Sequence, residues 1–299
     1  MSYPSKPIRL VTTGGGGSHE YAARFLAPAL SKAFGVPVDL DLQPESGSDQ
    51  ADLVSKAAPD GHTLLVSGRT HWLIPLLNVQ ARYDALRDFA PVSQTTRGAE
   101  VLVVHPDNPV KTAGDIVALA KASPGQLKYA SNGDGGNNHL AAELFKSMAR
   151  VDIQRVRCSN SAERFAKLKV REIDMFFTGI CSFADQIRAG ELKALGVTSS
   201  TRSAIAPNLP TISESGVPGY ENITIGALFA PAATPVPILD KLAEVTAKVM
   251  QSEEAHDYFH EDGYEPVGST QAQLRELIVA DTKRVQGLLE IIGSNRMFG

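Results

Sequence analysis

The sequence has little of what defines several classes of protein. No apolar run approaches the ~20 residues that cross a bilayer, so direct membrane insertion is not expected. Positive charge is not clustered: 29 Lys and Arg face 33 Asp and Glu, which gives a formal net charge of −4. Because phosphate binding draws on clustered Lys and Arg, a nucleic-acid partner is not expected either. The 25 glycines and 18 prolines follow no period, which excludes collagenous and low-complexity chains.

Cysteine is scarce as well. Cys158 and Cys181 are compatible with a reduced cytosolic protein or with one disulfide in an oxidising compartment. No secretory leader is recognisable before the first strand-like segment, so the compartment stays open at this point. The 299 residues are 43% hydrophobic and 21% charged. At about 150 residues per domain, that composition and length indicate a globular protein of two domains.

Strand and helix patterns alternate along the chain. Strands with helices of this length between them predict an α/β fold in which each domain is a mostly parallel sheet flanked by helices. A polar return at 199–219 breaks the alternation, and mostly helix follows residue 236. The strand-like segments are 8–11, 36–42, 62–66, 101–104, 127–130, 153–156, 173–177, 192–197 and 227–230, and the helical ones are 22–30, 114–121, 139–149 and 162–169.

The same pattern predicts how the domains are divided. We expect a discontinuous first domain, residues 3–98 plus 227–299, around a continuous second domain, residues 99–226. The chain then crosses twice between the domains, which predicts a hinge and a ligand cleft between them.

The strongest local motif is a run of four glycines, 14–17, between the first strand and the first helix. Glycine lets the backbone approach a ligand closely, and the N–H groups and dipole of a helix start favour an anion. Ser18 is a suitable N-cap, and His19 and Glu20 fall in the first helical turn. We therefore predict an anion site here; the alternative is a flexible turn that binds nothing.

This turn also allows a different interpretation, a nucleotide-dependent enzyme. Asp39 or Asp41, at the end of the next strand, could bind a ribose. However, the third glycine of the G-x-G-x-x-G fingerprint is missing, and no G-x-x-x-x-G-K-[ST] phosphate loop occurs in the chain. The nucleotide-dependent enzyme therefore stays open as the weaker alternative.

Other catalytic and metal motifs are incomplete. The H-E-x-x-H pattern that begins at His19 has Ala23 in place of its second histidine. His256 and His260 lie four apart on a polar helix, which is more typical of a solvated face than of a zinc site. The G-x-S-x-G elbow of serine hydrolases fails around Ser18. We therefore expect no metal, no cofactor and no enzymatic activity.

A second Gly-rich turn, residues 131–139, again follows a strand and precedes a helix. By the same argument it predicts an anion site at a helix start, now in the second domain. One such turn in each domain, on either side of a hinge, is the arrangement expected of a protein that closes around a small acid. A third polar turn, 67–72, contains Arg69, which could pair bidentately with a carboxylate.

Six further motifs occur together along the chain. They are Tyr3-Pro4-Ser5-Lys6-Pro7-Ile8; Ala57-Ala58-Pro59-Asp60-Gly61; Tyr83-Asp84 with Asp88-Phe89-Ala90-Pro91-Val92; His139-Leu140-Ala141-Ala142-Glu143-Leu144-Phe145; Leu209-Pro210-Thr211-Ile212-Ser213-Glu214-Ser215-Gly216; and Leu228-Phe229-Ala230-Pro231 with Thr234-Pro235. In this order, and with the Gly-rich turns, the sequence resembles the Bug receptors (the TctC family), the extracytoplasmic solute-binding proteins of tripartite tricarboxylate transporters. The resemblance covers essentially the whole chain.

The resemblance implies a two-domain periplasmic-binding-protein fold that closes like a flytrap. It also implies a periplasmic protein, whose leader is not part of this sequence, and a ligand that is usually a carboxylate. The implied partners are a small organic acid and the membrane subunits of a transporter, with the receptor itself a monomer. A binding fold reused as a sensor stays an alternative, as does the nucleotide-dependent enzyme.

Several positions in the predicted cleft depart from the family pattern. Thr12-Thr13-Gly14 stands in place of a Pro-Phe-Pro-like run, and Arg157-Cys158-Ser159-Asn160 in place of Pro-Tyr-Lys-Gly. Thr178 stands where the family has Asp, and Ile225 where an aromatic residue is usual. We infer an intact fold with an altered ligand. The ligand is expected to be more anionic, because the cleft gains arginines at 69 and 157 and loses an acid at 178.

The Gly-rich turns and the resemblance together define a candidate ligand site. In the family, the two turns hold the ligand largely through backbone amides, hydroxyls and ordered waters. The residues that we assign to ligand binding are Gly16, Gly17, Ser18, His19, Glu20, Arg69, Thr70, Gly133, Gly135, Asn137, Asn138, Arg157, Thr178 and Ile225.

Overall fold

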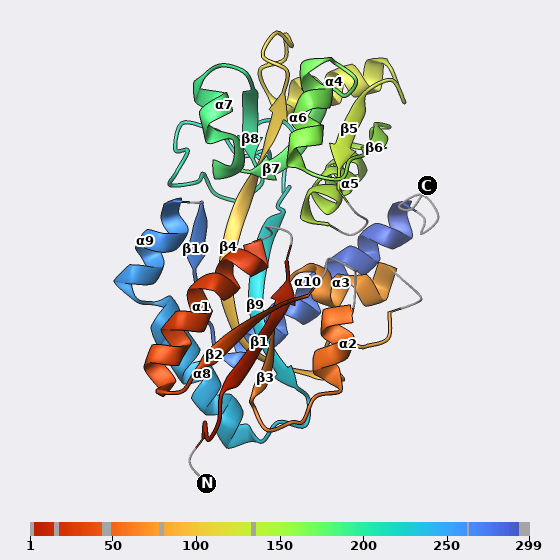
Figure 1. Cartoon of the computed structure of the whole chain (residues 1–299). Coiled ribbons are helices and arrows are strands. Elements are labelled where there is room, and N and C mark those ends of the chain that lie inside the picture. The colour runs from red at the N-terminus through yellow and green to blue at the C-terminus, as the bar shows by residue number, and fades with distance from the viewer. Residues whose placement is uncertain are drawn as a thin grey trace. The chain divides into compact units, whose positions relative to one another are not determined.

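The computed structural model describes residues 3–14, 18–43, 49–77, 81–132, 136–261 and 263–292. The chain divides into two compact units (Figure 1). Among the described helices, none combines the length and the apolar character that crossing a bilayer requires. Unit 1 comprises residues 1–97, 224–260 and 264–286, and unit 2 comprises residues 98–223, 261–263 and 287–299.

Unit 1 is built on a mixed sheet whose strands follow the order β2-β1-β3-β9-β4. β1 pairs in parallel with β2 and β3, whereas β9 pairs with β3 in the antiparallel direction, and the short strand β10 pairs with β4. The elements are β1 (Ile8–Thr13), α1 (Ser18–Phe34), β2 (Val38–Gln43), α2 (Asp49–Ser55), β3 (Thr63–Gly68), α3 (Thr70–Leu77), β4 (Phe89–Val104), β9 (Ile223–Pro231), α8 (Val236–Met250), α9 (Glu253–Glu261), β10 (Tyr264–Pro266) and α10 (Gln271–Ile292).

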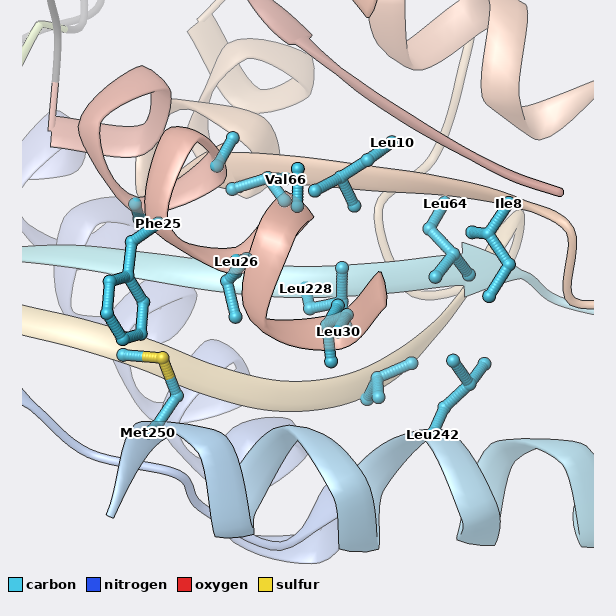
Figure 2. Close-up of a cluster of buried hydrophobic side chains, with 14 of the residues drawn as sticks. Ile8, Leu10, Phe25, Leu26, Leu30, Leu64, Val66, Leu228, Leu242 and Met250 are labelled. Carbon is cyan, nitrogen blue, oxygen red and sulfur yellow. The ribbon is translucent and has the colours of Figure 1, made fainter. Parts of the chain in front are cut away.

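The core of unit 1 lies between this sheet and helices α1 and α8. Helix α1 lies across β1, β2 and β3, and contacts α8 (Figure 1). The apolar side of α1 is buried because its residues recur at helical spacing, as Phe25, Leu26 and Leu30 show. Figure 2 shows these side chains in one cluster with Leu64 of β3 and Leu242 of α8, and shows Phe25 beside Met250 of α8. This packing fixes where α1 begins relative to the ends of β1 and β3.

Unit 2 is built on a second mixed sheet. Its strands follow the order β4-β7-β5-β6, and β8 also pairs with β4. β5 pairs in parallel with β6 and β7, whereas β7 and β8 pair with β4 in the antiparallel direction. The elements are α4 (Ala113–Ala122), β5 (Lys128–Ser131), α5 (Asn137–Ala149), β6 (Gln154–Arg157), α6 (Ser161–Lys169), β7 (Met175–Gly179), the 3-10 helix η1 (Cys181–Phe183), α7 (Ala184–Arg188) and β8 (Lys193–Val197).

The predicted α/β fold class is confirmed by these two sheets with their flanking helices. The sheets are mixed because the long strands β4 and β9 add antiparallel pairs to the parallel ones. Strand β4 is also much longer than the pattern at 101–104 predicts. Its first half, through the polar run 93–97, breaks the apolar pattern by which a strand is recognised, yet most of these residues are buried.

One of the motifs on which the family resemblance rests has a packing reason in unit 2. Gly216 has φ +153°, and a Cβ there would lie 2.2 Å from the backbone nitrogen of Gly114. The Gly114 N–H donates to the Ser215 carbonyl, at 2.8 Å. Only glycine permits this approach of two backbones, so the 209–216 motif belongs to the framework of unit 2.

Candidate functional site

The first Gly-rich turn joins β1 to α1 in unit 1. Because β1 and β3 pair in parallel, their carboxyl ends, Thr13 and Gly68, meet at the same edge of the sheet. Helix α1 begins beside them with Ser18 as its first residue. Gly16 and Gly17, both assigned to ligand binding from the sequence, lie outside the described residues.

His19 lies between the ends of these two strands. Its Nε2 is 2.5 Å from Thr13 Oγ1, and its Nδ1 would be 3.6 Å from a Cβ built on Gly68. Burial lowers the pKa of His19 despite the opposing charge of Glu20, so the imidazole is neutral at neutral pH. A neutral imidazole offers one donor and one acceptor, and Thr13 occupies one of the two nitrogens.

Glu20 is buried in the first turn of α1, where its charge complements the helix dipole. Its Oε1 accepts a hydrogen bond from Arg24 Nε at 2.8 Å, one turn along the same helix. The carboxylate is therefore paired within α1. That pairing limits the negative charge that Glu20 presents to an anion bound at the helix start.

Arg69 follows β3 and has a carboxylate partner within the chain. Its Nε and Nη2 donate to the two carboxylate oxygens of Asp281 on α10, at 2.7 and 2.6 Å. Trp72 Nε1 donates to the same carboxylate at 2.8 Å. Burial by itself raises the pKa of Asp281, but the hydrogen bonds and charge of Arg69, with Trp72, hold it below its ordinary value.

The bidentate carboxylate partner of Arg69 is thus Asp281, not a bound molecule. Arg69, Trp72 and Asp281 are 5%, 2% and 8% exposed, so the three form a buried structural network. A role of Arg69 toward a ligand stays a prediction, and that role has to use N–H groups other than the pair that Asp281 receives. The sequence could not show this pairing because 212 positions separate the two residues.

Two further predicted residues lie beside Arg69. The Arg69 backbone N–H donates to the carbonyl of Ile225 on β9, at 3.1 Å, and Thr70 is the first residue of α3. The Ile225 side chain is buried in unit 1. Unit 1 thus places His19 near the end of β3 at Gly68, and the backbone of Arg69 is bonded to Ile225 at the same end.

The second Gly-rich turn joins β5 to α5 in unit 2. The Asn132 N–H donates to Oδ1 of Asn138, at 3.4 Å, which ties the end of β5 to the first turn of α5. Asn222 Nδ2 donates to Oδ1 of Asn137, at 3.4 Å. Gly133 and Gly135, also assigned to ligand binding, lie outside the described residues.

An arginine that the sequence analysis did not single out contacts this turn. Arg155 on β6 donates from Nε to Ser131 Oγ at 2.7 Å and from Nη2 to the Asn132 carbonyl at 2.6 Å. The predicted Arg157 ends the same strand, exposed, opposite Ser131 in the β5–β6 register. The two arginines are two residues apart, and the even spacing places them on one face of β6.

A second such arginine lies next to the predicted Thr178. Thr178 is buried in β7, and Arg164 of α6 donates from Nη1 to the carbonyl of the preceding residue, Phe177, at 3.3 Å. Burial lowers the pKa of Arg164, and the charge of Glu100 opposes that effect. The end of β7 therefore has a buried guanidinium beside a neutral residue at 178.

The two cysteines both belong to unit 2. Within the part of the chain that the structure describes, Cys158 and Cys181 form no disulfide. Cys158 is buried, and burial raises the pKa of its thiol. A protonated buried thiol is chemically inert, so neither turn gains a reactive group from Cys158.

Comparison with protein families settles what kind of protein carries these turns. The family model described as the tripartite tricarboxylate transporter family receptor, TctC, matches residues 22–294. The chain belongs to the TctC receptor family.

Relatives of this receptor extend along nearly its whole length. A UPF0065 protein of Bordetella pertussis is 30% identical over 98% of this chain and 91% of its own, and protein BugT of the same organism has the same identity and coverage. A Rhodopseudomonas palustris protein, solved with adipate, is 29% identical with a TM-score of 0.86 and covers 98% of this chain and 99% of its own.

The family predicted from the sequence motifs is therefore confirmed. Members of the TctC family are receptors that bind a solute and work with transporter components, and this chain is such a receptor and not an enzyme. The nucleotide-dependent enzyme and the sensor are not favoured. The fold class is confirmed a second time, because the solved relatives share it over the whole chain.

Proposed function

We propose that this TctC receptor captures a small organic acid with its two Gly-rich turns and delivers it to the membrane subunits of a tripartite transporter. The observation that carries the proposal is the pair of helix starts, α1 and α5, each placed directly after a strand that has parallel neighbours. Such helix starts favour a carboxylate through their N–H groups and dipole. The relative solved with adipate is consistent with a ligand of this class.

The side chains at the two turns suit an acid that binds through hydrogen bonds. Ser18, the neutral His19, Asn137 and Asn138 are uncharged, so their N–H and O–H groups contribute directed hydrogen bonds without repelling an anion. Hydrogen bonds to a charged group contribute about 1.5–3 kcal/mol each. Three of them at the upper end of this range, or four near its middle, reach the ~8 kcal/mol of micromolar binding.

We further propose that the ligand is more anionic than a simple monocarboxylate, and that unit 2 sets this preference. Arg69 no longer supports the idea, because its charge is balanced by Asp281. Arg157 does support it, since this exposed arginine brings positive charge to the end of β6, the strand that pairs with β5 beside α5. Neutral compounds that bind as tightly as their anionic counterparts would remove this preference.

The setting of the receptor is part of the proposal. A receptor of a tripartite transporter works in the periplasm, so we place this protein there, as a monomer that closes around one ligand. The ligand drives closure only to the extent that it binds the closed form more tightly than the open one. Light scattering of the purified protein with and without ligand tests the monomer, since a doubled mass in either state contradicts it.

A binding screen tests the proposed function. The purified protein is titrated by thermal shift and calorimetry with mono-, di- and tricarboxylates, including adipate, and with NAD(P)H. A ligand at a hundredfold excess over its Kd adds about 2.7 kcal/mol of stability, which thermal shift detects readily. We expect a shift with one class of carboxylate; a shift with NAD(P)H alone would overturn the proposal.

Variants at the two helix starts locate the binding. His19→Ala and Asn137→Ala each remove one polar group from a turn, and we expect the affinity for the acid to fall at least tenfold in both. Arg188→Met is the matched control, because this exposed arginine on α7 pairs only with a neighbour on its own helix in the described structure. Equal affinity in all variants would place the acid elsewhere on the protein.

A further inference from the structure

Arg155 makes a forked contact to the end of β5. It stands opposite Tyr129 in the β5–β6 register, and its side chain extends two positions along the sheet to reach Ser131 and Asn132. Ser131 is fully buried, whereas Arg155 is half-buried. The guanidinium therefore reaches from the edge of unit 2 to two acceptors at the point where the strand gives way to the turn.

The same peptide is held from its other side. The Asn132 carbonyl accepts from Arg155, and the Asn132 N–H donates to Asn138 in the first turn of α5. The contacts form a continuous path from β6 through the end of β5 to the start of α5. A planar guanidinium presents its N–H groups at fixed angles, so it can fix two acceptors at once, whereas an ammonium group cannot reproduce that fork.

We propose that Arg155 is a positioning residue of the ligand site: it fixes the end of β5 so that the start of α5 meets the ligand in one geometry. This inference rests on the proposed function, because it concerns the same turn. A helix start that is held in one orientation loses less conformational entropy when a ligand binds, so its affinity is higher than that of a mobile helix start with the same groups.

A positioning role has to be separated from a purely electrostatic one. Arg155 also carries a positive charge, with Arg157 on the same face of β6, and either charge attracts an anion through space. Arg155→Lys keeps the charge and loses the fork. Ser131→Ala keeps the arginine and removes one of its acceptors. Arg155→Met removes both the charge and the fork.

The first experiment measures the turn itself and needs no ligand. Hydrogen exchange of the whole protein is followed by mass spectrometry in wild type, Arg155→Lys, Arg155→Met and the control Arg188→Met. We expect at least tenfold faster exchange in peptides that cover residues 131–140 in both Arg155 variants, and unchanged exchange at the start of α1. Wild-type exchange at 131–140 in the Arg155 variants would overturn the positioning role.

The second experiment titrates the same proteins with the carboxylates of the screen, adipate included. We expect Arg155→Lys and Ser131→Ala to weaken binding at least fivefold and Arg155→Met at least tenfold, with Arg188→Met within twofold of wild type. Wild-type affinity in Arg155→Lys would show that Arg155 acts only as a charge. If Arg155→Met does not fold, the lysine and alanine variants carry the test.

The two outcomes separate this inference from the proposed function. A wild-type protein that binds none of the acids contradicts the proposed function, while the exchange measurement still decides whether Arg155 fixes the turn. A wild-type protein that binds an acid, with Arg155 variants that bind it equally well, contradicts the positioning role alone. A double variant, Ser131→Ala with Arg155→Met, should weaken binding no further than Arg155→Met by itself, because both remove the same contact.

Discussion

Each unit fixes the carboxyl end of a parallel strand with an arginine, and the two arginines do so in different ways. In unit 1, Arg69 after β3 is buried against the carboxylate of Asp281, from the far end of the chain. In unit 2, Arg155 is half-buried and contacts a hydroxyl and a carbonyl, both neutral, within 24 positions. The first contact balances a buried charge, and the second sets the geometry of a turn.

The difference between the two arginines predicts which property of the protein changes when each contact is removed. A buried charge that loses its partner is expensive in any state of the folded protein, so the effect falls on stability. A half-exposed arginine that loses neutral acceptors can turn to water, so the effect on stability is smaller and the effect on the turn dominates.

The largest expected effect comes from breaking the buried pair. Asp281→Asn removes the charge that balances Arg69 while it keeps the size of the side chain. We expect the free energy of unfolding, measured in urea, to fall by about 3–5 kcal/mol, the usual cost of leaving one member of a buried pair uncompensated. Asp185→Asn is the control, since its partner Arg188 is exposed. A loss below about 1 kcal/mol would contradict a buried pair that matters for stability.

The second effect is the loss of stability of unit 1 in acid. His71 of unit 1 is 2% exposed, lies between Tyr83, Phe89 and Phe229, and has no hydrogen-bond partner for either ring nitrogen among the described residues. Burial lowers its pKa from 6.5 to about 3, with a small opposing effect of Asp84. The folded protein therefore binds fewer protons than the unfolded chain between these two values.

The free energy of unfolding must then fall as the pH drops below 6.5, by up to about 1.4 kcal/mol per pH unit. His71→Phe should be less sensitive to pH between 7 and 5, a window that lies above the ordinary pKa of 3.8 for Asp281. Trp72, the only tryptophan, lies in unit 1 and reports its unfolding by fluorescence. Equal pH dependence in wild type and His71→Phe would show that this histidine does not titrate as its burial requires.

The third effect tests the other side of the comparison. Arg155→Met should lower the free energy of unfolding by about 1–2 kcal/mol, less than Asp281→Asn, because the two acceptors that lose their donor are neutral. Urea unfolding at pH 7 measures both variants under one condition. If Arg155→Met destabilises the protein as much as Asp281→Asn, the contrast between a stabilising and a positioning arginine fails.

The smallest effect concerns an ion pair in which only the arginine is exposed. Arg24 is half-exposed and pairs with Glu20 one turn away on α1. Arg24→Met should lower the stability by only about 0.3–0.5 kcal/mol, as for other pairs at this helical spacing. High salt should remove most of the difference between this variant and wild type. A loss above about 2 kcal/mol would show that Glu20 is as dependent on its partner as Asp281.

The sequence predicted the parts of the fold that repeat locally. The alternation of strands and helices and the two Gly-rich turns lie within short windows, so period and composition reveal them. The first half of β4 was missed because Ser93–Arg97 is polar, although all of these residues except Arg97 are buried. Helix α3 was missed as well, because Pro75 and a polar start obscure its period.

The candidate site divides in the same way. Ser18, His19, Asn137 and Asn138 stand next to glycines and could be proposed from the sequence alone. Arg155 could not, since its importance comes from a strand register that brings Ser131 alongside it. A pair of arginines two apart in a short strand, 155 and 157, was the only available sign.

What the sequence by itself determined is therefore the α/β class, the receptor family and the position of the two Gly-rich turns. Each of these follows from residues that are neighbours in the chain or from motifs that a family shares. Only the tertiary structure decided that Arg69 belongs to Asp281 and that Arg155 reaches Ser131 and Asn132. The reason is physical: which acceptor a guanidinium contacts depends on how distant segments pack, and the local sequence around either arginine does not determine that packing.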